Sequence, residues 1–311
     1  MDFSRVRAAL ADVVAIPVTP FAADGRLDTG AYHALLRRLL DAGVRTVTPN
    51  GNTGEFYALS PEERLLVVEL TVAEVGDRAE VVVGVGLDLA SAVAAARHAG
   101  DAGASMVMVH QPVHPYVSQD GWVAYQRTVA DAVPGLGVVP YIRDPRITAG
   151  ALARLGALCP NVVGVKYAVP DATRFSSFAQ DAGRDATGGT GGTGPDRFVW
   201  VAGLAELYAP AYWAGGATGF TSGLVNVAPD LSLALLAALR AGDAGAAREV
   251  CERIRPFEEL RAARHSADNV SVVKEALAVL GLCRRDVRPP SSSLPAGTRA
   301  EVAALVRAWG V

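Results

Sequence analysis

The chain has 311 residues, half of them hydrophobic, and its 29 basic residues nearly balance 32 acidic ones for a formal net charge of −3. No run or stripe of basic residues is present, which argues against a nucleic-acid partner. No apolar segment reaches the roughly 18 uninterrupted residues that a membrane span needs, so we expect no membrane partner either.

The cysteines indicate a reducing compartment. Cys159, Cys251 and Cys283 form no CxxC pair and are odd in number, which is typical of free thiols. The first residues, MDFSRVRAALADVV, mix charged and apolar side chains and contain no apolar signal core. We therefore expect a cytoplasmic protein.

Short apolar segments alternate with helical segments along most of the chain. The expected strands are residues 15–21, 46–51, 81–86, 105–112, 137–142, 162–168, 198–203 and 217–223. The expected helices between and after them are residues 29–42, 60–75, 89–101, 118–132, 148–157, 171–182, 205–214 and 229–240. Ser60, Pro61 and Glu63 are typical of a helix start, and Asp88 can cap the helix that follows it.

Eight strand–helix units predict a (β/α)8 TIM barrel, because a strand followed by a helix requires parallel strands joined by crossovers. An open doubly wound sheet is the competing fold. We assign residues 1–243 to the catalytic barrel and residues 244–311, with three more helical segments, to a C-terminal helical extension packed on it. The Gly/Thr-rich residues 184–196 predict a flexible surface insertion.

The carboxyl ends of barrel strands carry the chemistry in this fold, so each strand end supplies candidates. Lys166 stands inside the apolar stretch VVGVKYA (162–168), and alternation places it on the face opposite Val165. If that face is the barrel interior, burial lowers the lysine pKa and frees an amine to attack a carbonyl. The alternative is a structural lysine paired with a carboxylate.

Polar candidates follow the neighbouring strand, in VVPYIRDPR (138–146). The phenol of Tyr141 can carry protons to and from a substrate, or it can simply pack and hydrogen-bond a loop. Arg143 and Arg146 can each clamp a carboxylate, or each can be an ordinary surface arginine.

The second strand ends in PNGNTGEF (49–56), where Gly51 and Gly54 allow an unusual turn that can present backbone N–H groups to an anion. Asn52 and Thr53 add side-chain donors. This loop is a candidate for binding a substrate carboxylate, and a plain tight turn is the alternative.

The last two strands end in small residues that suit a pocket wall or close packing. Gly203 ends VAG (201–203), and Thr221 and Ser222 lie in GFTSG (219–223). We assign all three to substrate binding.

Metal and cofactor motifs are weak. His110 and His114 are four residues apart at a strand end, with no third ligand near them in sequence, so we predict no metal site. GVG (84–86) is too short for a dinucleotide fingerprint. We expect no cofactor.

The motifs GNTGE (51–55), Tyr141 and VVGVK (162–166) occur in the order found in the dihydrodipicolinate synthase/N-acetylneuraminate lyase family, which the chain resembles over its whole length. The resemblance implies that Lys166 forms an imine with the keto carbon of a 2-keto acid and that Tyr141 is the proton shuttle. It also implies that Thr53 hydrogen-bonds Tyr141 and binds the carboxylate with the backbone of residues 52–54. The carbonyl of Thr221 would line the pocket.

Departures from the family pattern bear on the substrate. Val113 and His114 occupy the positions of a tyrosine pair in the synthase branch, with Tyr116 shifted. GNTGEF, YIRDP and AELYAPAY resemble the 5-dehydro-4-deoxyglucarate dehydratase branch, which implies that Arg143 contacts a distal carboxylate. That branch has Asp-Gly after the lysine, where this chain has Tyr167 and Ala168.

We therefore predict a Schiff-base lyase that dehydrates or cleaves a keto-deoxy sugar acid. The first alternative is a dihydrodipicolinate synthase, which condenses pyruvate with aspartate semialdehyde. The second, of another class, is a barrel that binds keto acids without turnover. The resemblance implies a homotetramer or a homodimer.

Overall fold

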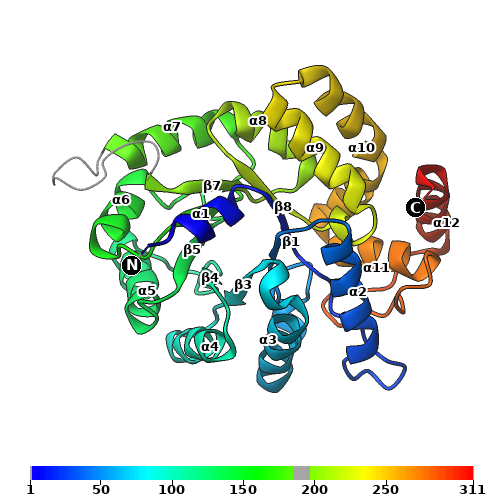
Figure 1. The fold of residues 1–311 in the computed structure, drawn as a ribbon, viewed down its shortest axis with the longest axis horizontal. Coiled ribbons are helices and arrows are strands. Elements are labelled where there is room, and N and C mark those ends of the chain that lie inside the picture. Colours follow the sequence, from blue (N-terminus) through cyan, green and yellow to red (C-terminus); the bar gives the residue numbers. More distant parts are fainter. Residues whose placement is uncertain (1, 185–196, 311) are drawn as a thin grey trace. The chain divides into compact units, whose positions relative to one another are not determined.

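Eight parallel strands close into a barrel in the computed structural model, which describes residues 2–184 and 197–310 (Figure 1). The hydrogen-bonded order of the strands follows the chain. This topology confirms the predicted (β/α)8 barrel and excludes the open doubly wound sheet. The strands are β1 (Val13–Ala15), β2 (Thr46–Val47), β3 (Glu80–Val85), β4 (Met106–Val109), β5 (Gly137–Ile142), β6 (Gly164–Tyr167), β7 (Val199–Ala202) and β8 (Gly219–Ser222).

Helices follow the strands as the alternation predicts, and further helices follow the last one. They are α1 (Ser4–Leu10), α2 (Thr29–Asp41), α3 (Pro61–Val75), α4 (Leu89–Ala102), α5 (Gln119–Ala132), α6 (Ala149–Leu158), α7 (Ala172–Arg184), α8 (Ala209–Ala214), α9 (Pro229–Ala241), α10 (Ala244–Ser266), α11 (Asn269–Val279) and α12 (Ala296–Trp309). Within the described ranges, no helix is both long enough and apolar enough to cross a membrane. The predicted insertion at residues 184–196 lies, from residue 185 on, outside the described residues.

The predicted helix starts are confirmed by their caps. Ser60 and Glu63 form a capping box at α3: the Ser60 Oγ accepts the Glu63 N–H at 3.2 Å, and the Glu63 carboxylate accepts the Ser60 N–H at 2.9 Å. Asp88 accepts the Ser91 N–H at 2.9 Å at the start of α4. Each of these bonds satisfies a backbone donor that the first turn of a helix leaves without a partner.

The first strand is misplaced by the sequence prediction. Residues 15–21 were expected to form it, whereas β1 ends where that segment begins. Pro17 and Pro20 explain the error, because proline has no N–H to donate and cannot continue a paired central strand. The same reasoning applies to β2, which ends two residues before Pro49.

The chain forms two compact units. The first comprises Met1–Asp12 and Glu80–Thr221, and the second comprises Val13–Ala79 and Ser222–Val311. The predicted helical extension at residues 244–311 falls in the second unit, where α10 packs on α9 and α11 packs on α10. A separate domain boundary after residue 243 stays a prediction.

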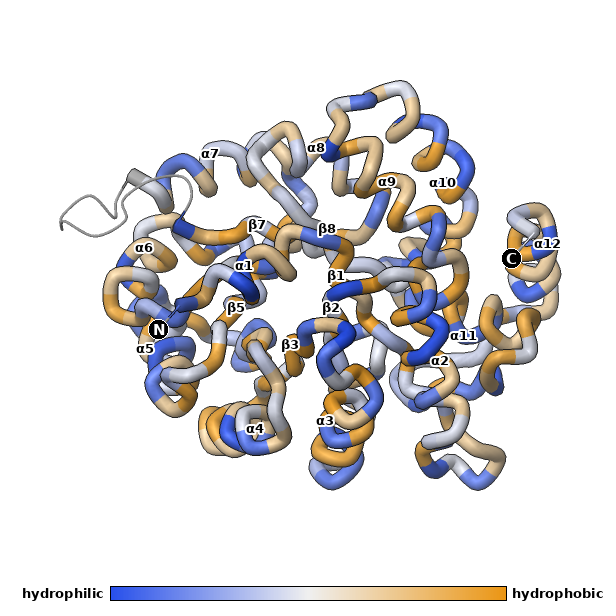
Figure 2. The backbone as a smooth tube through the Cα atoms, viewed as in Figure 1, coloured by the Kyte–Doolittle hydropathy of each residue, from blue (hydrophilic) through white to orange (hydrophobic). Residues whose placement is uncertain are grey.

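Strands and helices of the first unit differ in how apolar residues are distributed. The residues of β4 and β5 are all buried, whereas α5 and α6 have buried and exposed faces. Figure 2 shows the same contrast, with β5 and β7 mostly orange and α5 alternating between orange and blue. The strands therefore form the inner layer of this unit.

Helix α1, which no sequence pattern predicted, covers the amino-terminal ends of strands in the first unit. Gly164 begins β6 and Gly219 begins β8. A Cβ atom at Gly164 would lie 2.9 Å from Leu10 Cδ1, and one at Gly219 would overlap the Leu10 carbonyl oxygen. Arg7 donates a hydrogen bond of 3.1 Å to the carbonyl oxygen of Val163. This packing leaves the carboxyl ends of the strands to carry functional side chains.

Candidate active site

Lys166 and Tyr141 lie side by side near the carboxyl ends of β6 and β5. They are register partners in this parallel pair, and Lys166 Nζ lies 4.4 Å from the centre of the Tyr141 ring. Only 3% of Lys166 and 6% of Tyr141 is exposed. The structure therefore brings together the two residues to which the sequence assigns imine formation and proton transfer.

The surroundings of Lys166 disfavour its charged form. Burial is the larger cause and the positive charge of Arg143 the second; together they lower the pKa of Lys166 to about 7. In the described part of the chain, no carboxylate is among the groups that shift this pKa. The uncharged amine, which is the form that attacks a carbonyl, is therefore available near neutral pH.

The two candidate arginines after β5 differ in their contacts. Arg146 forms an ion pair with Asp144, with Nη2 2.6 Å from Oδ2 and Nε 3.0 Å from both carboxylate oxygens. These hydrogen bonds lower the pKa of Asp144. Arg143 is exposed, and its charge acts on Lys166. Arg146 is thus held by Asp144 within its own loop, whereas the charge of Arg143 acts on Lys166.

Gly203, at the end of β7, gives the Lys166 side chain room. Its N–H donates a hydrogen bond of 2.7 Å to the carbonyl oxygen of Tyr167. A Cβ atom at Gly203 would lie 3.0 Å from Lys166 Cγ and 2.8 Å from the Ala168 Cβ. The 2.8 Å contact is shorter than real Cβ contacts and the 3.0 Å contact is tight, so glycine is the residue that fits beside this lysine without a shift.

Thr221 and Ser222 are adjacent on β8 and fall in different units. The Thr221 hydroxyl donates to the carbonyl oxygen of Ala202 at 3.4 Å. The Ser222 Oγ accepts the Val225 N–H at 2.9 Å and lies 3.2 Å from the Ser232 Oγ. The Ser222 hydroxyl is thus engaged by a 3-10 turn (Leu224–Asn226) and by α9, and these contacts give its predicted binding role no support.

His110 contacts Tyr141, a feature that sequence analysis did not predict. The histidine is fully buried directly after β4, and the two ring centres are 5.9 Å apart in an edge-to-face arrangement. His114 is exposed and lies against Tyr116. Among residues 2–184 and 197–310, no three His, Cys, Asp or Glu side chains are grouped so as to hold a metal ion.

Tyr167, the residue that follows the lysine, is part of the core of the first unit. It is fully buried, with its ring centre 5.2 Å from those of both Phe175 and Phe178 and 6.2 Å from that of Tyr212. These rings belong to α7 and α8, so Tyr167 faces the helices while its neighbour Lys166 faces the other way. The residue after the lysine is a core residue here.

The loop after β2 turns tightly, though not where the sequence implies. The Gly54 N–H donates to the Gly51 carbonyl oxygen, and the Glu55 N–H donates to that of Asn52, both at 3.0 Å. Positive φ angles occur at Asn50 (58°) and Glu55 (60°) and not at the two glycines. The expectation that the glycines supply the unusual backbone conformation was therefore wrong.

Gly54 instead permits close packing against Pro17, whose carbonyl oxygen would lie 3.0 Å from a Cβ atom at Gly54. The carbonyl oxygen of Gly54 accepts the Thr19 hydroxyl at 2.7 Å. Thr53 is 5% exposed, and its Oγ1 lies 3.2 Å from the position that a Cβ atom at Gly223 would take. Because the Gly54 N–H is used within the loop, the predicted anion site rests on Asn52 and Thr53.

Lys274 is a buried residue for which the sequence predicts no role. This residue lies on α11, is fully buried, and forms an ion pair with Glu55. The sequence feature that could have marked Lys274 as important is the rarity of lysine, since Lys166 and Lys274 are the only lysines among 29 basic residues.

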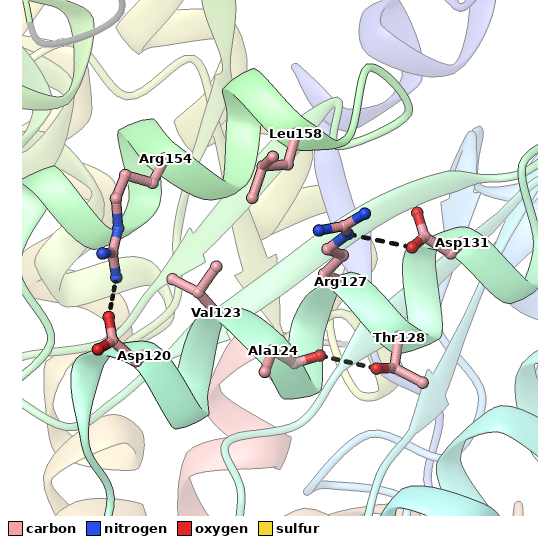
Figure 3. A pocket seen from close by; sticks show the side chains of 8 residues that line it. All are labelled: Asp120, Val123, Ala124, Arg127, Thr128, Asp131, Arg154 and Leu158. Carbon is pink, nitrogen blue, oxygen red and sulfur yellow. Dashed lines mark hydrogen bonds and ion pairs between the residues drawn. The ribbon is translucent and has the colours of Figure 1, made fainter.

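A groove of about 520 Å³ lies between α5 and α6 on the helical side of the first unit (Figure 3). Two ion pairs line it, Arg154 with Asp120 at 2.7 Å and Arg127 with Asp131 at 3.2 Å. Leu158 adds a half-exposed apolar side chain. None of the predicted site residues lines this groove.

Comparison with known proteins agrees with the fold and the motifs. Residues 9–309 match the dihydrodipicolinate synthetase family. A probable 5-dehydro-4-deoxyglucarate dehydratase of Rhizobium rhizogenes is 33% identical over 299 residues, which cover 95% of this chain and 93% of the relative. A 4-hydroxy-tetrahydrodipicolinate synthase of Acidiphilium cryptum is 32% identical over 307 residues, which cover 94% and 96%.

Solved structures of two dihydrodipicolinate synthases share the fold. The enzyme from Bacillus clausii is 37% identical with a TM-score of 0.91, and the match covers 98% of this chain and 100% of that one. The enzyme from Oceanobacillus iheyensis is 34% identical with a TM-score of 0.92, and the match covers 99% of both chains. With three motifs in order, a closed barrel and a family match along nearly its whole length, the chain belongs to the dihydrodipicolinate synthetase family.

Proposed function

We propose that the protein is a lyase in which Lys166 forms an imine with a 2-keto acid, and that its substrate is a keto-deoxy sugar acid. The observation that carries the proposal is the buried amine of Lys166, with its lowered pKa, against the ring of Tyr141. An uncharged amine beside a phenol supplies a nucleophile and a proton carrier at one place.

The chemistry follows from the imine. Lys166 Nζ adds to the keto carbon, and with the uptake of one proton the keto oxygen leaves as water, which gives a protonated imine. Because this imine withdraws electrons, the neighbouring carbon loses a proton and an enamine forms. The enamine then expels the hydroxyl group of the next carbon, which leaves as water after it takes up a proton. In a keto-deoxy sugar diacid, the distal carboxylate then leaves as CO2, and the electron pair of its C–C bond enters the conjugated unsaturated imine. The enamine that results takes up a proton, and hydrolysis of the final imine frees Lys166. Tyr141 is assigned the two proton transfers of the dehydration.

Substrate binding is assigned to polar groups at the strand ends. Asn52 and Thr53 would bind the carboxylate next to the keto carbon, as the family resemblance implies. Arg143 would contact the distal carboxylate of a sugar diacid, since its charge already acts on Lys166. Arg146 is the weaker candidate because Asp144 holds its guanidinium. Gly203 would line the pocket beside the lysine.

A dehydratase function is supported by the names of two relatives and by positions at which this chain departs from the synthase pattern. Relatives from Rhizobium rhizogenes and Rhodococcus opacus, each 33% identical, are named as probable 5-dehydro-4-deoxyglucarate dehydratases. Val113 and His114 replace the synthase tyrosine pair, and Val113 is 62% exposed. Dihydrodipicolinate synthesis is the alternative function, because the relative from Acidiphilium cryptum is named as a 4-hydroxy-tetrahydrodipicolinate synthase. A non-catalytic barrel is disfavoured because it has no use for a desolvated amine.

Borohydride reduction in the presence of pyruvate should attach one reduced pyruvate to the protein, detected by intact mass and located at Lys166 by peptide mapping. Lys166→Ala should give no adduct. Lys274 is the only other lysine and remains in this variant, so it serves as an internal control. An adduct that persists in Lys166→Ala would contradict the imine proposal.

The rate of adduct formation at saturating pyruvate should rise with pH and level off above about pH 7, because only the deprotonated amine attacks. Arg143→Gln removes a positive charge that lowers the Lys166 pKa, so this pKa should rise and the profile should move to higher pH. Arg146→Gln is the matched control and should leave the profile in place. An unmoved profile in Arg143→Gln would show that this charge does not act on the amine.

Tyr141→Phe should still form the imine but slow turnover by about 10²-fold or more, the effect of losing an acid–base group. Tyr167→Phe is the matched control: it also loses one phenol hydroxyl, but from a ring that faces α7 and α8, and it should keep turnover within a few-fold. Imine trapping and steady-state rates measure the two effects separately. Near-normal turnover in Tyr141→Phe would remove this residue from the mechanism.

Two assays should distinguish the candidate reactions. With 5-dehydro-4-deoxyglucarate we expect release of CO2 and loss of the substrate, since the branch that the chain resembles loses water and CO2. With pyruvate plus aspartate semialdehyde we expect no condensation product. Turnover in the second assay alone would assign the chain to dihydrodipicolinate synthesis.

A further inference from the structure

The second buried lysine, Lys274, joins α11 to the loop that follows β2. Its ammonium forms an ion pair with Glu55, donates a hydrogen bond of 2.8 Å to the carbonyl oxygen of Asp286, and lies 4.0 Å from the centre of the Phe21 ring. Lys274 is fully buried, and Glu55 is 5% exposed. All four residues belong to the second unit, so these contacts lie within one compact body.

Glu55 occupies a backbone conformation that needs support. Its φ of 60° lies in the left-handed region, which residues with a Cβ atom rarely adopt. One carboxylate oxygen accepts the backbone N–H of Arg288 at 2.9 Å, and the other accepts the Lys274 ammonium. Both oxygens are therefore fixed by residues from outside the loop.

Arg288 extends this support to the start of α3. Its two terminal nitrogens each lie 2.6 Å from an oxygen of Glu63, and one of them donates to the carbonyl oxygen of Ala58 at 3.1 Å. Its guanidinium also lies 4.2 Å from the centre of the Phe21 ring. The loop is thus held at Glu55, and again after it at Ala58 and Glu63, by charge-assisted hydrogen bonds.

An ion pair at this position fixes the orientation of the Glu55 carboxylate, which apolar packing would not do. A buried pair can often be replaced by apolar residues of similar volume without loss of stability, whereas removing one partner leaves a buried unpaired charge. Stability alone therefore does not account for a lysine here.

We propose that Glu55 and Lys274 are positioning residues that hold Asn52 and Thr53 in the conformation that binds the carboxylate of the 2-keto acid. The link is short, because Glu55 is two residues from Thr53 and its N–H donates to the Asn52 carbonyl oxygen at 3.0 Å. This inference rests on the proposed function for the role of Asn52 and Thr53. The mechanical part, that α11 sets the loop conformation, does not depend on it.

The test uses the double variant Glu55→Gln/Lys274→Met, which removes both charges with little change in volume. In the folded variant, the pyruvate concentration that gives half-maximal borohydride trapping should rise about tenfold or more, the loss expected when a hydrogen bond to a carboxylate is misplaced. The maximal trapping rate and its pH midpoint should stay close to those of the wild type, because Lys166 is untouched.

Arg285→Met is the matched control, since it removes another ion pair of α11, that between Arg285 and Glu275 at 3.1 Å. It should leave half-saturation unchanged. Half-saturation within twofold of wild type in a folded double variant would show that Glu55 and Lys274 have a purely structural role. If the double variant does not fold, Glu55→Gln alone is measured, because its amide oxygen still accepts a hydrogen bond.

Amide hydrogen exchange separates this inference from the proposed function. Backbone amides of residues 51–56 should exchange faster in the double variant than in Arg285→Met. Unchanged exchange would overturn the inference, whatever the trapping result. If exchange is faster in the double variant but the wild-type protein forms no pyruvate adduct, the proposed function is overturned. The conclusion that α11 supports the loop would then still stand.

Discussion

The cost of placing a charged amine in an apolar interior is the constraint on which the candidate site depends. A buried ammonium without a carboxylate partner loses its hydration, and the group responds by giving up its proton more easily. Strand alternation directs Lys166 to one side while Val165 and Tyr167 pack on the other, and Gly203 leaves space along its side chain. The same apolar residues that form the core therefore lower the pKa of this amine.

Most of the fold could be predicted, because each strand and helix has its own local signal. Apolar runs, helix caps such as Ser60 and Asp88, and the regular alternation are properties of short segments. The two failures have different causes, a local one at the first strand and a long-range one at helix α1. Pro17 and Pro20 allow an extended chain but not a paired strand. Helix α1 is defined by its contacts with Gly164 and Gly219, which are distant in sequence.

The candidate site could be predicted only in part, for related reasons. The strand-end rule places Lys166 and Tyr141 at one edge, and the register pairing agrees with it. No sequence rule distinguishes Arg146, which pairs two residues back with Asp144, from Arg143, whose charge acts on the lysine. Nor does any rule connect Lys274 with Glu55, since more than two hundred residues separate them and only the folded second unit brings them together.

The burial of both lysines also determines how the protein surface reacts with reagents that modify amines. Lys166 and Lys274 are 3% and 0% exposed, so the basic side chains on the described surface are guanidinium groups and imidazoles. Acylating or glycating agents that modify surface amines in other proteins find no lysine to react with there. Enzymes that acetylate lysine side chains likewise find no exposed target. A small aldehyde or activated ester that labels this chain must first enter its interior.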